Sequence, residues 1–224
     1  MSIDPYLVLV FIHILLFVYW LGGDLGVFIT AKYVANRSLS LDERFRFMHA
    51  LLVCDMAPRT ALILFIPVGF HMASVLGLLP INGPWLGLIW LFGLSWLALN
   101  WWLFKNERHP RANAVRDFDI YLRYAVMAAM ALMGLVSMFT GQPIVAQWLA
   151  AKIFLFSCVM MTGVYLRGEI KQWIVGFGMV RQGGETADKG NTIIEQSLVR
   201  SQRAAFLLWF GVALIAFLGK TKPF

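Results

Sequence analysis

Three nitrogen-bearing side chains lie in the middle of strongly apolar stretches of the sequence: His13, His71 and Lys152. Each is eight or nine residues from one end of its stretch, which corresponds to about 12–14 Å along a helix. Ionisable groups are costly inside a membrane and usually serve a function there. If the three helices are neighbours, these groups share one layer of the bilayer and can act on one ligand.

Two imidazoles at equal depth on facing helices suit axial ligation of a haem iron, and imidazole is also a good copper ligand. His13 and His71 are therefore predicted metal ligands, with haem b as the cofactor and copper as the alternative. Lys152 is placed to bind an acidic group such as a haem propionate. Alternatively, the histidines only form hydrogen bonds between helices, and Lys152 extends its amine to the outer surface. The side chains expected to line a haem slot are Trp20, Phe70, Met72 and Met133.

A second polar layer is predicted deeper in the same stretches. Asp24 lies 19 residues from the outer end of its stretch, and Arg59 lies 21 residues from the outer end of the next. Antiparallel neighbours would bring these opposite charges to one level, where each lowers the cost of burying the other. We therefore predict a structural ion pair between Asp24 and Arg59, with a proton or anion pathway as the alternative.

The elements that must position these groups are transmembrane helices. The chain is 60% hydrophobic, only 14% charged, and has a mean hydropathy of +0.72. A soluble domain is about 25% charged, so lipid must solvate part of this surface. We predict an all-α polytopic bundle, residues 1–224, as a single integral membrane domain. Six stretches are long enough to span a bilayer, roughly 6–30, 56–79, 85–104, 121–140, 144–166 and 204–219.

The distribution of basic residues predicts the orientation of this bundle. All of the 19 lysines and arginines except Lys152, Lys220 and Lys222 lie at one set of connections or in the adjoining helix turns. Basic loops stay in the cytoplasm, so both termini are predicted to be periplasmic, in the inner membrane of a bacterium. The connection 167–203 is then a cytoplasmic loop, with a short helix expected from Asn191 to Gln202.

The same composition excludes other classes of protein. The net charge of +7 does not indicate nucleic-acid binding, because the basic residues stand in short loops between apolar stretches. Cys54 and Cys158 lie in different stretches and form no CxxC motif, so no disulfide or zinc site is predicted. The sequence contains no visible Ser-His-Asp set, glycine-rich phosphate loop or carboxylate pair.

Three segments resemble a known superfamily of membrane proteins. His13 is followed by Trp20 in HILLFVYWLGGDLGVF, Lys152 stands in WLAAKIFLF, and FRFMHALLVCDMAPRTALILF lies between them. Together they resemble the superfamily of the CopD-type copper-resistance domain and the HemJ-type membrane protoporphyrinogen IX oxidase. The resemblance implies haem b binding and a role in activity for the first-helix histidine and the lysine. It therefore makes Lys152 the predicted catalytic residue. Trp20 is a predicted cofactor-binding residue because it is expected to line the haem slot beside His13.

The residues and the resemblance together predict a haem-b-binding membrane redox protein, either an oxidoreductase or an electron-transfer subunit. Its partners would be the lipid bilayer, a quinone or porphyrin, and a redox partner subunit or a second copy of the chain. Two alternatives stay open: a copper transporter using His13, His71 and nearby methionines, and a membrane scaffold without catalysis.

Overall fold

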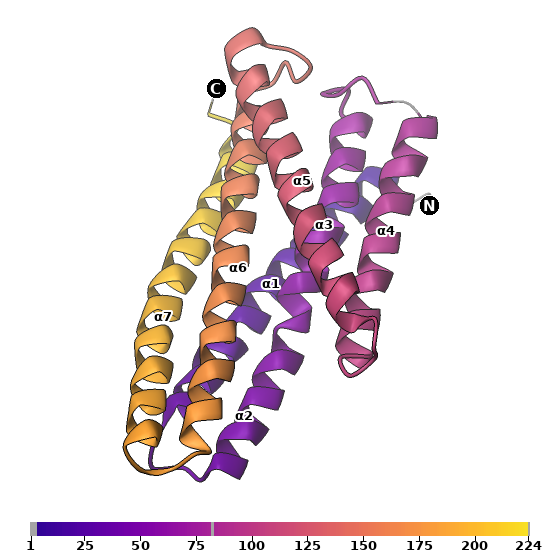
Figure 1. The fold of residues 1–224 in the computed structure, drawn as a ribbon. Helices are drawn as coiled ribbons and strands as arrows, with labels where there is room; N and C mark the ends of the chain where they lie inside the picture. The colour runs from indigo at the N-terminus through magenta and orange to yellow at the C-terminus, as the bar shows by residue number, and fades with distance from the viewer. Residues whose placement is uncertain (1–3, 82, 224) are drawn as a thin grey trace.

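A computed structural model describes residues 4–81 and 83–223, and these residues form α-helices joined by short connections (Figure 1). Within this part of the chain, six helical segments are long and apolar enough to cross a membrane, and α2 and α3 together make one of them. The predicted all-α bundle of about six spans is confirmed. The helices are α1 (Pro5–Ala35), α2 (Leu41–Cys54), α3 (Met56–Val75), α4 (Gly83–Lys105), α5 (Ala112–Thr140), α6 (Gln147–Val180) and α7 (Gly184–Thr221).

Local sequence signals explain where the first two helices begin. Asp4 caps α1, since its side chain accepts a hydrogen bond from the Tyr6 amide at 2.9 Å, and Pro5 occupies the first turn, where its missing N–H costs nothing. Ser40 and Glu43 form a reciprocal capping box that starts α2. The chain then passes through Asp55 directly into α3.

The helices form two groups that meet through two pairs of helices. In one group α1 packs against α2 and α3, and α3 packs against α4; in the other, α6 packs against both α5 and α7. The groups meet through α1 against α7 and through α4 against α5. Figure 1 shows the orange and yellow pair α6 and α7 running side by side over most of their length. A large buried core connects both groups, while many large apolar side chains of α1 and α4 face outward, as lipid contact requires.

The connection between the fifth and sixth spans is much shorter than we predicted. Helix α6 continues to Val180 and α7 already begins at Gly184, so residues 167–203 form two helix extensions instead of a loop with a short helix. The tight turn uses Gly183 and Gly184, whose φ angles of 79° and 57° favour glycine. Hydropathy did not predict these extensions because their polar residues carry no membrane signal.

The extensions have a core of their own, separate from the membrane part. Ends of α1, α2, α6 and α7 bury an apolar cluster centred on Val34, Leu51, Phe177 and Ile194. An ion pair between Arg37 and Glu195 joins α7 to the segment that follows α1; a second hydrogen bond joins the same side chains at 2.6 Å. This arrangement fixes the basic end of the bundle and thereby the relative positions of α1 and α7.

Candidate functional site: a cavity between the two helix groups

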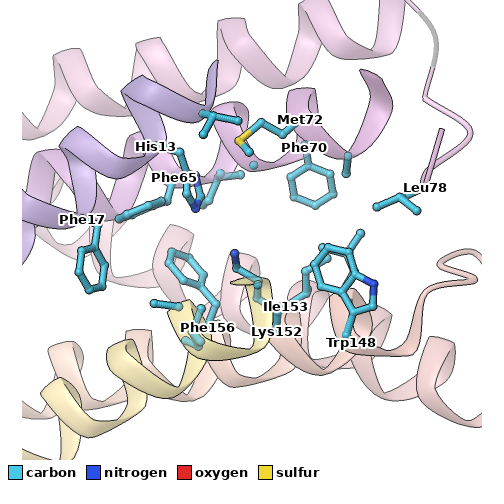
Figure 2. Close-up of a pocket in the computed structure, with 18 of the residues that line it drawn as sticks. His13, Phe17, Phe65, Phe70, Met72, Leu78, Trp148, Lys152, Ile153 and Phe156 are labelled. Atoms are coloured by element: carbon cyan, nitrogen blue, oxygen red, sulfur yellow. The ribbon is translucent and has the colours of Figure 1, made fainter. Parts of the chain in front are cut away.

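The end of the bundle opposite these extensions contains a cavity of about 520 Å³. It lies between the two helix groups and is lined mainly from α1, α3, α6 and α7 (Figure 2). Most of the lining side chains are apolar or aromatic. The basic ones are His13, Lys152, Lys220 and Lys222. A cavity of this size falls within the range of small-molecule and cofactor sites, about 300–1,000 Å³.

His13 projects into this cavity from α1. Its ring packs edge-on against Phe65 of α3, with 4.7 Å between the ring centroids. The ring atom Nδ1 is buried and has no hydrogen-bond partner within the described residues. Figure 2 shows a ring nitrogen of His13 directed across the cavity toward Lys152 on the opposite wall. The imidazole is therefore held by an aromatic neighbour without being used up in a helix-to-helix hydrogen bond.

Lys152 reaches the cavity from α6 and passes beneath the end of α7. A methyl group added at Gly219 would lie 2.7 Å from the Lys152 Nζ, so the absence of a side chain at Gly219 leaves space for the amine. None of the ion pairs found in the described part of the chain involves Lys152. The amine of Lys152 thus lies at the cavity, and no carboxylate among the described residues forms an ion pair with it.

Trp20 closes the cavity on its deeper side. Its side chain is only 2% exposed and packs against Phe65 and Phe156, at centroid distances of 5.6 and 6.0 Å. One residue each from α1, α3 and α6 therefore forms an aromatic floor.

The structure does not bring His71 to the same cavity. The His71 ring lies on the α4 side of α3, where its Nδ1 accepts a hydrogen bond from Trp90 Nε1 at 3.3 Å. Its neighbours Phe70 and Met72 line the cavity instead. Equal depth predicted a shared layer, but successive helix residues are rotated by about 100°, so depth alone does not decide which helix a side chain faces.

The predicted ion pair between Asp24 and Arg59 is not formed. Arg59 pairs with Asp55, which precedes it by four residues and therefore lies on the same helix face. Asp24 lies close to Trp20 of α1, Trp209 of α7 and Asp55, and its Oδ2 is buried without a hydrogen-bond partner within the described residues. Arg59 therefore pairs with Asp55, one helical turn away, and not with Asp24 on the neighbouring helix.

A more extensive polar site was not predicted from the sequence. Asp119 of α5 is 1% exposed and accepts hydrogen bonds from Trp96 of α4, Arg123 of α5 and Arg167 of α6, at 2.8, 2.9 and 2.8 Å. This carboxylate therefore connects three helices across the contact between the two groups. The spacing of four residues between Asp119 and Arg123 was a signal that the sequence offered.

Fold and cavity together define a multi-pass α-helical membrane protein with a cavity inside its bundle. No protein-family model matches this chain, and neither a curated protein nor a solved structure matches it significantly. The similarity to the CopD-type and HemJ-type proteins therefore stays a prediction.

Proposed function

We propose that this chain is a haem-b-binding membrane redox protein in which His13 is the protein ligand to the iron. The proposal rests on His13, whose Nδ1 has no hydrogen-bond partner among the described residues and which faces Lys152 across a cavity with aromatic walls. Neutral imidazole is the usual nitrogen ligand of haem iron. The sequence favoured two axial histidines; the position of His71 beside Trp90 leads us to propose His13 alone.

The residues of the cavity fit such a group. The apolar and aromatic walls suit the macrocycle, and the volume of about 520 Å³ is typical of cofactor sites. Lys152 supplies a positive charge for a propionate. Once bound, the haem would supply one-electron redox chemistry.

The chain's own residues set the conditions for that chemistry. His13 would determine the electron density at the iron, and the floor formed by Trp20, Phe65 and Phe156 would exclude water from the deeper side. Because the cavity lies inside a membrane bundle, its reaction partner would be membrane-soluble, such as a quinone or a porphyrin. Lys152 is then the residue placed to contact an acidic group of that partner.

The test is the absorption spectrum of the purified full chain, oxidised and dithionite-reduced, after production with ample haem. A Soret band with reduced α and β bands is expected for the unaltered protein. His13→Gly should lose that spectrum, and added imidazole should restore it by occupying the vacated position. His71→Ala is the matched control, because His71 is outside the cavity and should leave the bands in place.

Two results would contradict this assignment. Loss of the spectrum in both histidine variants would restore the two-histidine arrangement that the sequence predicted. A featureless spectrum from well-folded, haem-supplied protein would remove haem altogether and leave the transport or scaffold alternatives.

Copper binding is a second candidate, since Met72 lines the same cavity as His13. Imidazole and thioether form a donor set that suits copper in its reduced state. Metal analysis of protein purified from copper-supplemented cells would detect it. Met72→Leu should then lower the copper content while leaving any haem spectrum unchanged, because the copper candidate depends on the thioether.

A further inference from the structure

The charged residues around the cavity are all of one sign. Lys152, Lys220 and Lys222 line it, and no aspartate or glutamate is among the lining residues of the described chain. The lysines come from α6 and from the last turn and the end of α7. A cavity with apolar walls and only positive charges is complementary to an acidic ligand.

The nearest candidate counter-charge is already engaged. Asp4 is the only acidic residue at this end of the bundle in the described chain, and its carboxylate caps α1 by accepting a hydrogen bond from the Tyr6 amide. None of the three lysines takes part in an ion pair of the described residues. The positive charge therefore remains available to a bound molecule.

Contacts of two of these lysines place them beside the cavity wall. The Lys222 Nζ lies 5.4 Å from the centroid of the Trp148 ring, and Trp148 is itself part of the cavity wall. Lys152 reaches the same space beneath Gly219. The charges thus lie on the α6–α7 side, while much of the aromatic surface lies on α1 and α3 (Figure 2).

We infer that the cavity selects an amphiphile with carboxylate groups, held with these groups at Lys152, Lys220 and Lys222 and with its apolar body against α1 and α3. This inference rests on the proposed function only in placing a ligand in the same cavity, and it does not require iron. It adds the orientation of the ligand: its acidic edge faces the end of the bundle where α1 begins and α7 ends.

The experiment compares iron-free protoporphyrin, a dicarboxylic acid, with its uncharged dimethyl ester. Both are titrated against the full chain in nanodiscs of zwitterionic lipid, and binding is measured from porphyrin fluorescence. The unaltered protein should bind the diacid about tenfold more tightly than the ester, and added salt should reduce this preference. The double variant Lys220→Met, Lys222→Met should reduce it to about threefold, since exposed charges are partly screened.

Lys105→Met is the matched control. Lys105 is the last residue of α4 and does not line the cavity, so this variant should retain the full preference for the diacid. Equal binding of diacid and ester by the unaltered protein would overturn the inference, as would an unchanged preference in the double variant. Since the probe contains no iron, the His13 spectrum can fail while this preference persists, or the reverse. The two proposals therefore fail separately.

Discussion

Single polar side chains contribute strongly to the stability of this protein, because few of its buried side chains are polar. Asp119 is the clearest case: one carboxylate holds an indole N–H and two guanidinium groups from three helices. The Arg123 side chain is only 6% exposed, so it has little access to water that could replace the carboxylate. Such a charge cluster is stable only while every member is present.

Asp119→Asn should therefore destabilise the protein by about 3–5 kcal/mol, because the buried Arg123 and the partly buried Arg167 lose their counter-charge. The measurement is the thermal unfolding temperature of the purified protein in detergent, which should fall markedly. Asp117→Asn is the control, since Asp117 is exposed two residues away and should leave the unfolding temperature unchanged. A stable Asp119→Asn protein would mean that Asp119 does not hold the two helix groups together.

For single residues, the sequence predicted well how deep a side chain lies in the membrane. It predicted poorly which neighbouring helix the side chain faces. The count of residues along each stretch placed His13 and Lys152 in one layer, and the structure brings both to one cavity. The same count placed His71 there, yet that ring faces Trp90 on α4. Depth follows from the rise per residue alone, whereas direction depends on which helices become neighbours, and one sequence contains no measure of that.

Helices α6 and α7 approach each other closely at two glycines. A methyl group added at Gly190 would lie 2.5 Å from the backbone oxygen of Gly176, and one added at Gly176 would lie 2.9 Å from that of Gly190. Such mutual contact between small residues lets two backbones approach, as in closely packed membrane helices. The polar extensions of α6 and α7 therefore depend on glycine at both positions.

Gly190→Ala should destabilise this helix pair by about 1–3 kcal/mol, because the methyl group meets backbone that cannot move aside. Gly178→Ala is a matched control on α6, since a methyl group there meets nothing within 4 Å and alanine favours a helix. The midpoint of thermal unfolding, measured by circular dichroism, should be lower for Gly190→Ala. For Gly178→Ala it should be unchanged or higher. Equal midpoints would show that the close approach contributes nothing.

The helix elements themselves were largely predictable, and their lengths were not. Apolar content identifies a span because apolar side chains are stable in lipid. All six predicted stretches accordingly fall within or overlap observed helices. Beyond the bilayer that signal ends, and α7 continues through polar residues from Gly184. Its extension is stabilised by packing on α1, α2 and α6, which depends on tertiary contacts that hydropathy does not contain.

The whole molecule combines two asymmetries that run along the same axis. Its basic residues collect at the end built from the helix extensions, and its cavity lies toward the other end, between the two helix groups. Excess lysine and arginine marks the cytoplasmic side. The cavity would then lie in the outer half of the bilayer, with Lys220 and Lys222 at its periplasmic mouth.

Cysteine labelling tests this orientation directly. In a variant with Cys54 and Cys158 replaced by alanine, a single cysteine is introduced either at Gln142, in the turn between α5 and α6, or at Gln182, in the turn between α6 and α7. A membrane-impermeant maleimide should label Gln142→Cys in cells with only the outer membrane permeabilised. Gln182→Cys should react only after the inner membrane is opened, because it lies in the turn between the two basic extensions.

The reverse pattern would place the cavity mouth in the cytoplasm and change the source of its ligand. With the predicted pattern, the acidic edge of an amphiphile at Lys220 and Lys222 would face the periplasm, and its apolar body would lie at the level of the outer leaflet. With the reverse pattern, the same lysines would collect acidic amphiphiles from the cytoplasmic side, where anionic lipids compete for them. Orientation therefore decides which molecules can reach His13 and Lys152, although the geometry of the cavity stays the same.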